Sequence, residues 1–269
     1  MTIARPDNFV ETYRLKAALP NLHELTGRAN FSECTRFVLQ QAIDVLDIQP
    51  EDVVVDVGCG DGWLLSQLDA RISKGIGTAA SNEEADRLMK AYSGRRNISF
   101  IQALANNLPL ASQSATKVVC NSVFHFLHER SILLGAMDEL IRIARPGALI
   151  FVGEVLDKDE QRSLKGNGFR AFCGRLAYLF KGNGGVSRFH LAERGWSFLR
   201  ALFVRSSLFI VHPKKTICIE SNLLIKYAKQ RDVELIFMRR HIGLNEMAKQ
   251  EESRTRVDYL FRKPTASHQ

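Results

Sequence analysis

The chain has 269 residues, with 37 Lys and Arg against 29 Asp and Glu, which gives a formal net charge of +8. Hydrophobic residues make up 45% of the chain and charged residues 25%, a globular composition that excludes intrinsic disorder. The five cysteines show no CxxC or Cys/His spacing, which argues against a structural zinc site and a secreted disulfide framework. No signal-peptide core is evident, and no apolar stretch approaches the roughly 18–20 residues that span a bilayer. We therefore expect a cytoplasmic protein without a metal.

Helices and strands alternate in the first part of the chain. Residues 1–50 are predicted to be helical, because apolar residues recur at helical spacing from Phe31 to Leu46. Beyond them, strands are predicted at 53–57, 74–79, 98–102, 115–121 and 148–155, and helices at 63–68, 82–92 and 129–144. A helix at 223–231 and an antiparallel hairpin of 233–240 with 256–262 follow. This alternation predicts an α/β, Rossmann-like fold with a seven-stranded, mostly parallel sheet and helices on both faces.

The positive charge is concentrated in residues 157–219. This segment holds 12 Lys and Arg but only 4 acids, so it carries the whole net charge of the chain. Large apolar residues such as Phe169, Phe172 and Leu176 recur there at helical spacing, with Arg170 and Arg175 between them. The pattern predicts amphipathic basic helices that form a lid over a pocket, or that contact an anionic membrane or a lipid-linked molecule. RNA binding is less favoured, because the aromatic residues are expected to be buried and not exposed as stacking platforms.

The strongest local signal is the segment from Val53 to Gly62, which reads VVVDVGCGDG. A glycine-rich turn after a buried strand lets backbone N–H groups approach a ligand at the start of the next helix. Dinucleotide-binding proteins share such turns, so the turn alone does not identify the ligand.

The acid at Asp56, two residues before the first glycine, makes this segment resemble motif I of class I S-adenosylmethionine-dependent methyltransferases. Three further segments resemble motifs of that family in the same order. NLPL at 107–110 resembles the loop before strand four, VVCNSVFHFL at 118–127 the strand-four motif, and RPGALI at 145–150 the turn into strand five. The resemblance covers roughly residues 40–156 and is nearest to the small-molecule, ubiquinone-biosynthesis-like branch. The DPPY/NPPY signature of amino-directed nucleic-acid methyltransferases is absent.

The resemblance implies contacts between this chain and S-adenosylmethionine. Asp56 would orient the glycine loop and the methionine amino group, and Asn121 would face the methyl-bearing sulfonium. The remaining contacts would come from backbone groups: Gly58, Cys59 and Gly60 at the methionine moiety, and Ala105 at the adenine.

Two acids that this family usually carries are missing. Gly77 stands where the family's ribose-binding acid is expected, and Leu104 stands where an acid usually accepts from the adenine amine. A hydrogen bond to a charged group is worth about 1.5–3 kcal/mol, so cofactor binding is expected to be weaker than is usual. Thr78 and Glu83 are nearby groups that could substitute at the ribose.

The predicted organisation is a single methyltransferase domain. It comprises an N-terminal helical cap (1–50), a cofactor-binding core (51–156), a basic helical insert or lid (157–219) and a C-terminal helix with a strand hairpin (220–269). The predicted reaction is methyl transfer to a small-molecule or glycan acceptor, anionic or lipid-linked, with His125 as a candidate base. Peripheral contact with the inner face of a membrane would involve the insert. A non-catalytic interaction protein and an RNA methyltransferase are the alternatives.

Overall fold

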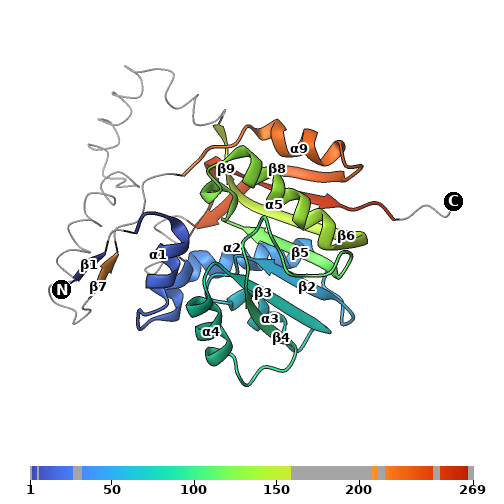
Figure 1. Ribbon diagram of the computed structural model, residues 1–269. Helices are drawn as coiled ribbons and strands as arrows, with labels where there is room; N and C mark the ends of the chain where they lie inside the picture. Colours follow the sequence, from blue (N-terminus) through green and yellow to red (C-terminus); the bar gives the residue numbers. More distant parts are fainter. Residues whose placement is uncertain are drawn as a thin grey trace, which may run out of the picture.

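The computed structural model describes residues 2–4, 6–26, 32–158, 208–210, 216–244 and 249–265. A seven-stranded sheet, with the order β4-β3-β2-β5-β6-β9-β8, forms the centre of the described fold (Figure 1). Its strands are β2 (Val53–Val57), β3 (Lys74–Ala79), β4 (Ile98–Gln102), β5 (Ala115–Asn121), β6 (Ala144–Leu156), β8 (Glu234–Leu244) and β9 (Gln250–Arg262). Strand β9 runs antiparallel to both of its neighbours, β6 and β8, and the other pairs in this sheet are parallel. The predicted fold class is confirmed.

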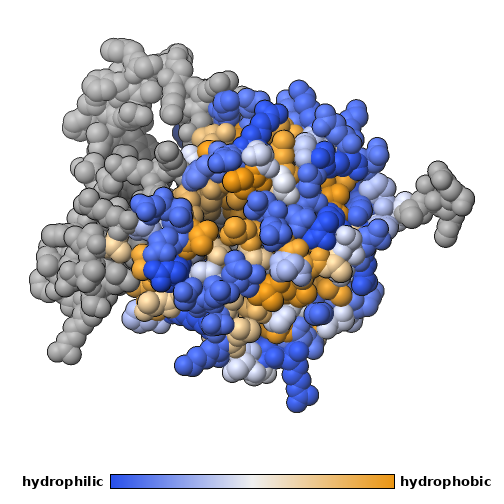
Figure 2. Space-filling model, in the orientation of Figure 1, coloured by the Kyte–Doolittle hydropathy of each residue, from blue (hydrophilic) through white to orange (hydrophobic). Residues whose placement is uncertain are grey.

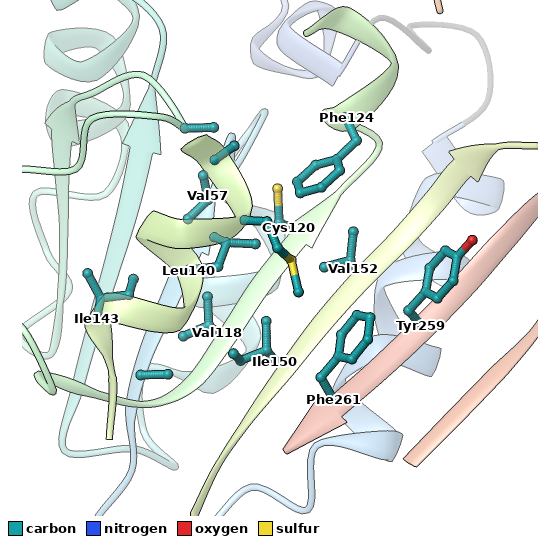
Figure 3. Close-up of a cluster of buried hydrophobic side chains, with 14 of the residues drawn as sticks. Val57, Val118, Cys120, Phe124, Leu140, Ile143, Ile150, Val152, Tyr259 and Phe261 are labelled. Atoms are coloured by element: carbon teal, nitrogen blue, oxygen red, sulfur yellow. The ribbon is translucent and has the colours of Figure 1, made fainter. Parts of the chain in front are cut away.

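Helices cover both faces of this sheet. One face packs against α2 (Ser32–Val45), α3 (Trp63–Leu68) and α4 (Asn82–Ala91), and the other against α5 (Arg130–Ile143) and α9 (Ser221–Lys229). Figure 3 shows the second core, where Leu140 and Ile143 of α5 meet Val118 and Ile150 of the central strands. These strands are apolar on both faces, as parallel strands between helix layers must be.

Before α2, the N-terminal cap contains α1 (Phe9–Lys16) and the short 3-10 helix η1 (Leu22–Thr26). It also contains a strand that the sequence did not predict, β1 (Thr2–Ala4), which pairs in parallel with β7 (Leu208–Ile210). Strand β7 is the one regular element described within the insert. The helices predicted for the rest of the insert, residues 159–207 and 211–215, lie outside the described residues.

The strand order reverses between β2 and β5, which lie side by side at the centre of the sheet. In open α/β sheets, ligands bind in the crevice at the carboxyl ends of the strands on either side of such a switch point. The glycine-rich loop after β2 and Asn121 at the end of β5 both lie at this place. The topology alone therefore brings together two motifs that are about sixty residues apart in sequence.

Candidate active site

The loop at residues 58–62 adopts a conformation that only glycines accommodate without strain. Gly58, Gly60 and Gly62 have φ angles of 73°, 57° and 75°. A methyl group added to Gly58 would also lie 2.5 Å from Cγ2 of Val123, which follows β5. Thr78 of β3 fixes the loop, because its Oγ1 accepts from the N–H of Gly58 at 3.0 Å. The Thr78 hydroxyl oxygen is thus already used within the protein.

Asp56 lies beneath this loop with its side chain buried. Among the described residues, no donor forms a hydrogen bond with its carboxylate. Burial, assisted by the nearby charge of Asp61, raises the pKa of Asp56 to about 7. A cation or a hydrogen-bond donor beside a buried, unpaired carboxylate stabilises its charged form. The amino group of a bound methionine moiety would provide both.

Gly77 lies inside β3, where it pairs with Asp56 on one side and with Phe100 on the other. A methyl group at Gly77 would lie 2.6 Å from Cδ1 of Phe100 and 2.8 Å from Sγ of Cys59. The missing side chain thus makes room for these two neighbours. The strand ends two residues later, at Ala79, so Gly77 lies within β3 and not at its carboxyl end, where the sequence prediction places it.

Glu84 brings a carboxylate to this strand end from the first turn of α4. Its Oε2 accepts from the N–H of Ala80 at 2.9 Å, and its own N–H donates to Oγ of Ser81, the N-cap residue of α4. Burial raises the pKa of Glu84 to about 7. Glu83, which the sequence suggested as a substitute for the ribose-binding acid, is exposed, and its Oε1 lies 4.0 Å from Nη1 of Arg14. The Ser-x-x-Glu capping box at 81–84 is the sequence signal that could have identified Glu84.

The loop after β4 presents an apolar side chain where an acid was expected. Leu104 is 43% exposed, whereas Ala105 is buried. A tight turn follows, in which the N–H of Asn107 donates to the carbonyl oxygen of Leu104 at 2.9 Å. An exposed leucine at the carboxyl end of β4 offers a flat apolar contact of the kind an adenine ring accepts, but no hydrogen-bond acceptor.

Asn121, the last residue of β5, is held by β6. Its Nδ2 donates to Oε2 of Glu154 at 3.1 Å, while its buried Oδ1 has no donor among the described residues. Glu154 is itself unusual, because it is buried and has a φ of 54° at an irregularity in the pairing of β6 with β9. Strained non-glycine residues of this kind persist only where the surroundings fix them.

The C-terminal hairpin supplies the groups that fix Glu154. Arg256 of β9 donates to Oε1 of Glu154 at 3.2 Å, and the backbone N–H of Glu154 donates to Oδ1 of Asp258 at 2.8 Å. His241 of β8 bridges the two acids, with Nδ1 3.0 Å from Asp258 and Nε2 3.5 Å from Glu154. No sequence pattern indicates this network, since its members lie on four strands that only the folded sheet brings together.

His125 lies on the short 3-10 helix η2 (Phe124–Phe126) beyond β5 and is 4% exposed. Its ring packs 4.1 Å from the ring of Phe126, and its carbonyl oxygen accepts from the N–H of Ile217 at 2.9 Å. A role as catalytic base stays a prediction. Burial raises the pKa of the thiols of Cys59 and Cys120 well above the ordinary value, so both are suited to packing and not to nucleophilic attack.

The N-terminal cap lies across this edge of the sheet. Phe9 of α1 packs on Phe126 beyond β5, with ring centroids 4.2 Å apart. At the other end of α1, Arg87 of α4 donates to the carbonyl oxygens of Lys16 and Ala17, both at 3.1 Å. Figure 2 shows apolar residues gathered beside this cap on the viewed face. The cap therefore spans the distance from the end of β5 to α4.

Two other findings bear on the site. The part of the chain that the structure describes holds no group of three or more His, Cys, Asp or Glu side chains placed to bind a metal ion, and no helix long and apolar enough to cross a bilayer. A small surface hollow occurs at the opposite, amino-terminal edge of β3 and β4, far from the glycine loop. Its lining is Ser73, Lys74, Arg96, Asn97, Ile98 and Ser99.

Residues 55–152 match the family described as "Methyltransferase domain", and no curated protein sequence matches the chain. Among solved structures, a putative methyltransferase in complex with the Haloferax volcanii Trm112 activator is 14% identical, with a TM-score of 0.61 over 94% of this chain and 97% of that one. The N-methyltransferase NodS of Bradyrhizobium japonicum WM9, solved with S-adenosyl-L-homocysteine, is 13% identical. Its TM-score is 0.61 over 96% of this chain and 100% of that one. The [4+2]-cyclase SpnF is 12% identical, with a TM-score of 0.61 over 95% of each chain.

At these identities the solved structures show the fold, and the different activities of these proteins leave the acceptor and any partner of this chain open. The domain match covers β2 through most of β6, which is the part that carries the glycine loop, Asp56 and Asn121. The described chain accordingly has the class I methyltransferase fold, and residues 55–152 match a methyltransferase domain.

Proposed function

We propose that this methyltransferase acts on a small-molecule or glycan acceptor that reaches the cofactor beneath the basic insert. The proposal is supported by the place at which the two ends of the basic insert leave the sheet. Lys158, at its start, donates its N–H to the carbonyl oxygen of Ile219, at its end, at 2.9 Å. Both ends of the insert therefore emerge together beyond β6, at the edge of the sheet that carries Asn121 and the glycine loop.

The described residues fit S-adenosylmethionine, which supplies an electrophilic methyl group. The glycine loop leaves space for close approach, and Asp56 offers a buried carboxylate without a protein partner. Leu104 offers an apolar surface to the adenine, and Asn121 is held rigidly at the end of β5 by Glu154. Most of the rate acceleration would come from the positioning of the acceptor, with His125 as the candidate base.

The charge of the insert suggests the chemistry of the acceptor. Twelve basic residues against four acids favour an anionic acceptor, such as a phosphorylated or lipid-linked sugar. They also favour peripheral contact with an anionic membrane from the cytoplasm, since each basic residue near such a surface contributes about 1 kcal/mol. Vesicle sedimentation at low and high salt tests this contact, and no binding at low salt would leave the insert as a lid alone.

Calorimetric titration with S-adenosylhomocysteine tests the cofactor site. We expect binding by the wild type and none by Gly58→Val, because the branched side chain would clash with Val123 and strain a backbone with a φ of 73°. Gly94→Val is the control, since no atom lies within 4 Å of a methyl group added there. Absence of wild-type binding at millimolar ligand would favour a non-catalytic relative, and equal affinity of Gly58→Val would exclude this loop as the site.

Leu104→Asp tests the position of the adenine. The side chain is 43% exposed, so an aspartate there stays hydrated and the fold is expected to tolerate it. If adenine lies against this loop, the new carboxylate accepts from the adenine amine and tightens S-adenosylhomocysteine binding by about 1–2 kcal/mol, the scale of one such hydrogen bond. Calorimetry on the folded variant measures this gain. Weaker binding would mean that the pocket depends on its apolar contact with Leu104.

A further inference from the structure

Glu154 is the residue at which backbone strain, burial and charge coincide in the described part of the central sheet. It is buried and has a φ of 54°, at the irregularity between Val152 and Val155 in the pairing of β6 with β9. The other non-glycine residues with a positive φ in the described ranges lie outside strands: Asp47, Gln113, Ser122 and Asp232. A glutamate strained inside a strand persists because its surroundings fix it, and such positions gather at functional sites.

The two carboxylate oxygens of Glu154 bind different parts of the fold. Oε1 accepts from Arg256 of the C-terminal hairpin, whereas Oε2 accepts from Nδ2 of Asn121 at the end of β5. Because a carboxylate only accepts hydrogen bonds, it specifies which end of the Asn121 amide faces it. Gly153 provides the space for the rest of this amide, since a methyl group there would lie 2.2 Å from Oδ1 of Asn121. The side chain of Asn121 is thereby held in one orientation.

The turn that follows Asn121 leads from this contact to the glycine loop. Ser122 has a φ of 61°, and its N–H donates to the carbonyl oxygen of Gly153 at 3.0 Å. The next residue, Val123, packs on Gly58, and its Cγ2 lies 2.5 Å from the position of a methyl group added there. A continuous series of contacts thus joins the end of β6 to the glycine loop.

The network around Glu154 is better suited to fixing a geometry than to adding stability, because the desolvation of buried charges offsets much of their attraction. We propose that Glu154 is a positioning residue of the methyltransferase site, which acts through Asn121 to hold the turn after β5 against the glycine loop. The inference rests on the proposed use of this loop as the cofactor site.

The first test is Glu154→Gln, measured by calorimetric titration with S-adenosylhomocysteine at a temperature where the variant is folded. Glutamine has one acceptor oxygen, so it can replace Oε1 or Oε2 of Glu154 as an acceptor but not both. We expect binding about 3- to 10-fold weaker than in the wild type, the scale of one hydrogen bond. Glu252→Gln, at an exposed position on β9, is the matched control and should bind as the wild type does.

A double-mutant cycle with Asn121→Ala tests whether Glu154 acts through Asn121. We expect Asn121→Ala to weaken S-adenosylhomocysteine binding, and Glu154→Gln to cause no further loss in that background. If Glu154 served the stability of the fold alone, its substitution would change the affinity by the same factor in both backgrounds. That result overturns the proposal.

A second pair of variants keeps the proposal testable if Glu154→Gln folds poorly by itself. Asn121→Asp places two carboxylates side by side and should weaken both the fold and the binding of S-adenosylhomocysteine. Adding Glu154→Gln restores a hydrogen bond with donor and acceptor exchanged, so the double variant should bind more tightly than Asn121→Asp alone. A double variant that does not bind more tightly overturns the proposal. If the wild type binds no S-adenosylhomocysteine, the cofactor site itself is wrong, which is a failure distinct from equal effects in the two backgrounds of a protein that binds.

Discussion

Gly77→Asp is expected to destabilise the folded protein strongly, and not to restore the family's ribose-binding acid. Atoms of Phe100 and Cys59 lie 2.6 and 2.8 Å from the site of the new Cβ, and the carboxylate would be buried among apolar side chains. Overpacking costs about 1–3 kcal/mol and a buried charge without a partner costs more, so we expect a loss of more than about 4 kcal/mol in the free energy of unfolding. Urea denaturation of the ligand-free protein measures it.

Two further variants make this result specific. Gly77→Ala adds only the methyl group and should lose about 1–3 kcal/mol, which isolates the steric part. Gly94→Asp, on an exposed loop with no atom within 4 Å of the new Cβ, should change the stability little. A stable Gly77→Asp protein that binds S-adenosylhomocysteine more tightly would contradict this account, because the acid would then reach the ribose from within β3.

The elements predicted best from the sequence are those whose signals are local. The bounds of β2, β3, β4, β5 and α3 agree with the sequence prediction to the residue, because each element is marked by a short local pattern of apolar residues. The resemblance likewise placed Asp56 and the glycine loop at the carboxyl edge of the sheet. Both depend on a few consecutive residues and on a topology that the strand–helix alternation specifies.

The prediction was less complete where structure depends on distant partners. Strand β6 begins at Ala144 and not at 148, because Ala144 pairs with Ala115 and a φ of 81° at Gly147 lets the chain turn within the pairing. Strands β8 and β9 are longer than their alternation indicated, because each extends the other. Length in such strands follows from pairing across the sheet, which composition does not encode.

The same reason explains which site residues the sequence did not reveal. Glu84 takes a position beside the end of β3 because the capping box turns its side chain back over Ala80. Glu84 thus brings a carboxylate to the end of β3 from a helix, and an alignment of strand motifs would not identify it.

The buried network beneath Asn121 predicts a large effect of Asp258→Ala. The variant would leave the N–H of Glu154 without its acceptor and His241 without its nearer carboxylate, in a region where both acids are 3% exposed. Removal of one partner from a buried charged network typically costs about 3–5 kcal/mol. We expect a loss of that size in the free energy of unfolding, measured by urea denaturation, and little change in Asp86→Ala on the surface of α4.

Asp258→Asn separates the contribution of the hydrogen bond with the N–H of Glu154 from the contribution of the negative charge of Asp258. The amide oxygen still accepts from the N–H of Glu154, so the backbone with a φ of 54° stays fixed and the loss should be smaller than for Asp258→Ala. If the network positions Asn121, Asp258→Ala should also weaken S-adenosylhomocysteine binding at a temperature where the variant is still folded, although residue 258 lies on a different strand. Native stability and unchanged affinity in Asp258→Ala would show that the strained conformation of Glu154 is maintained by β6 itself, without help from the C-terminal hairpin.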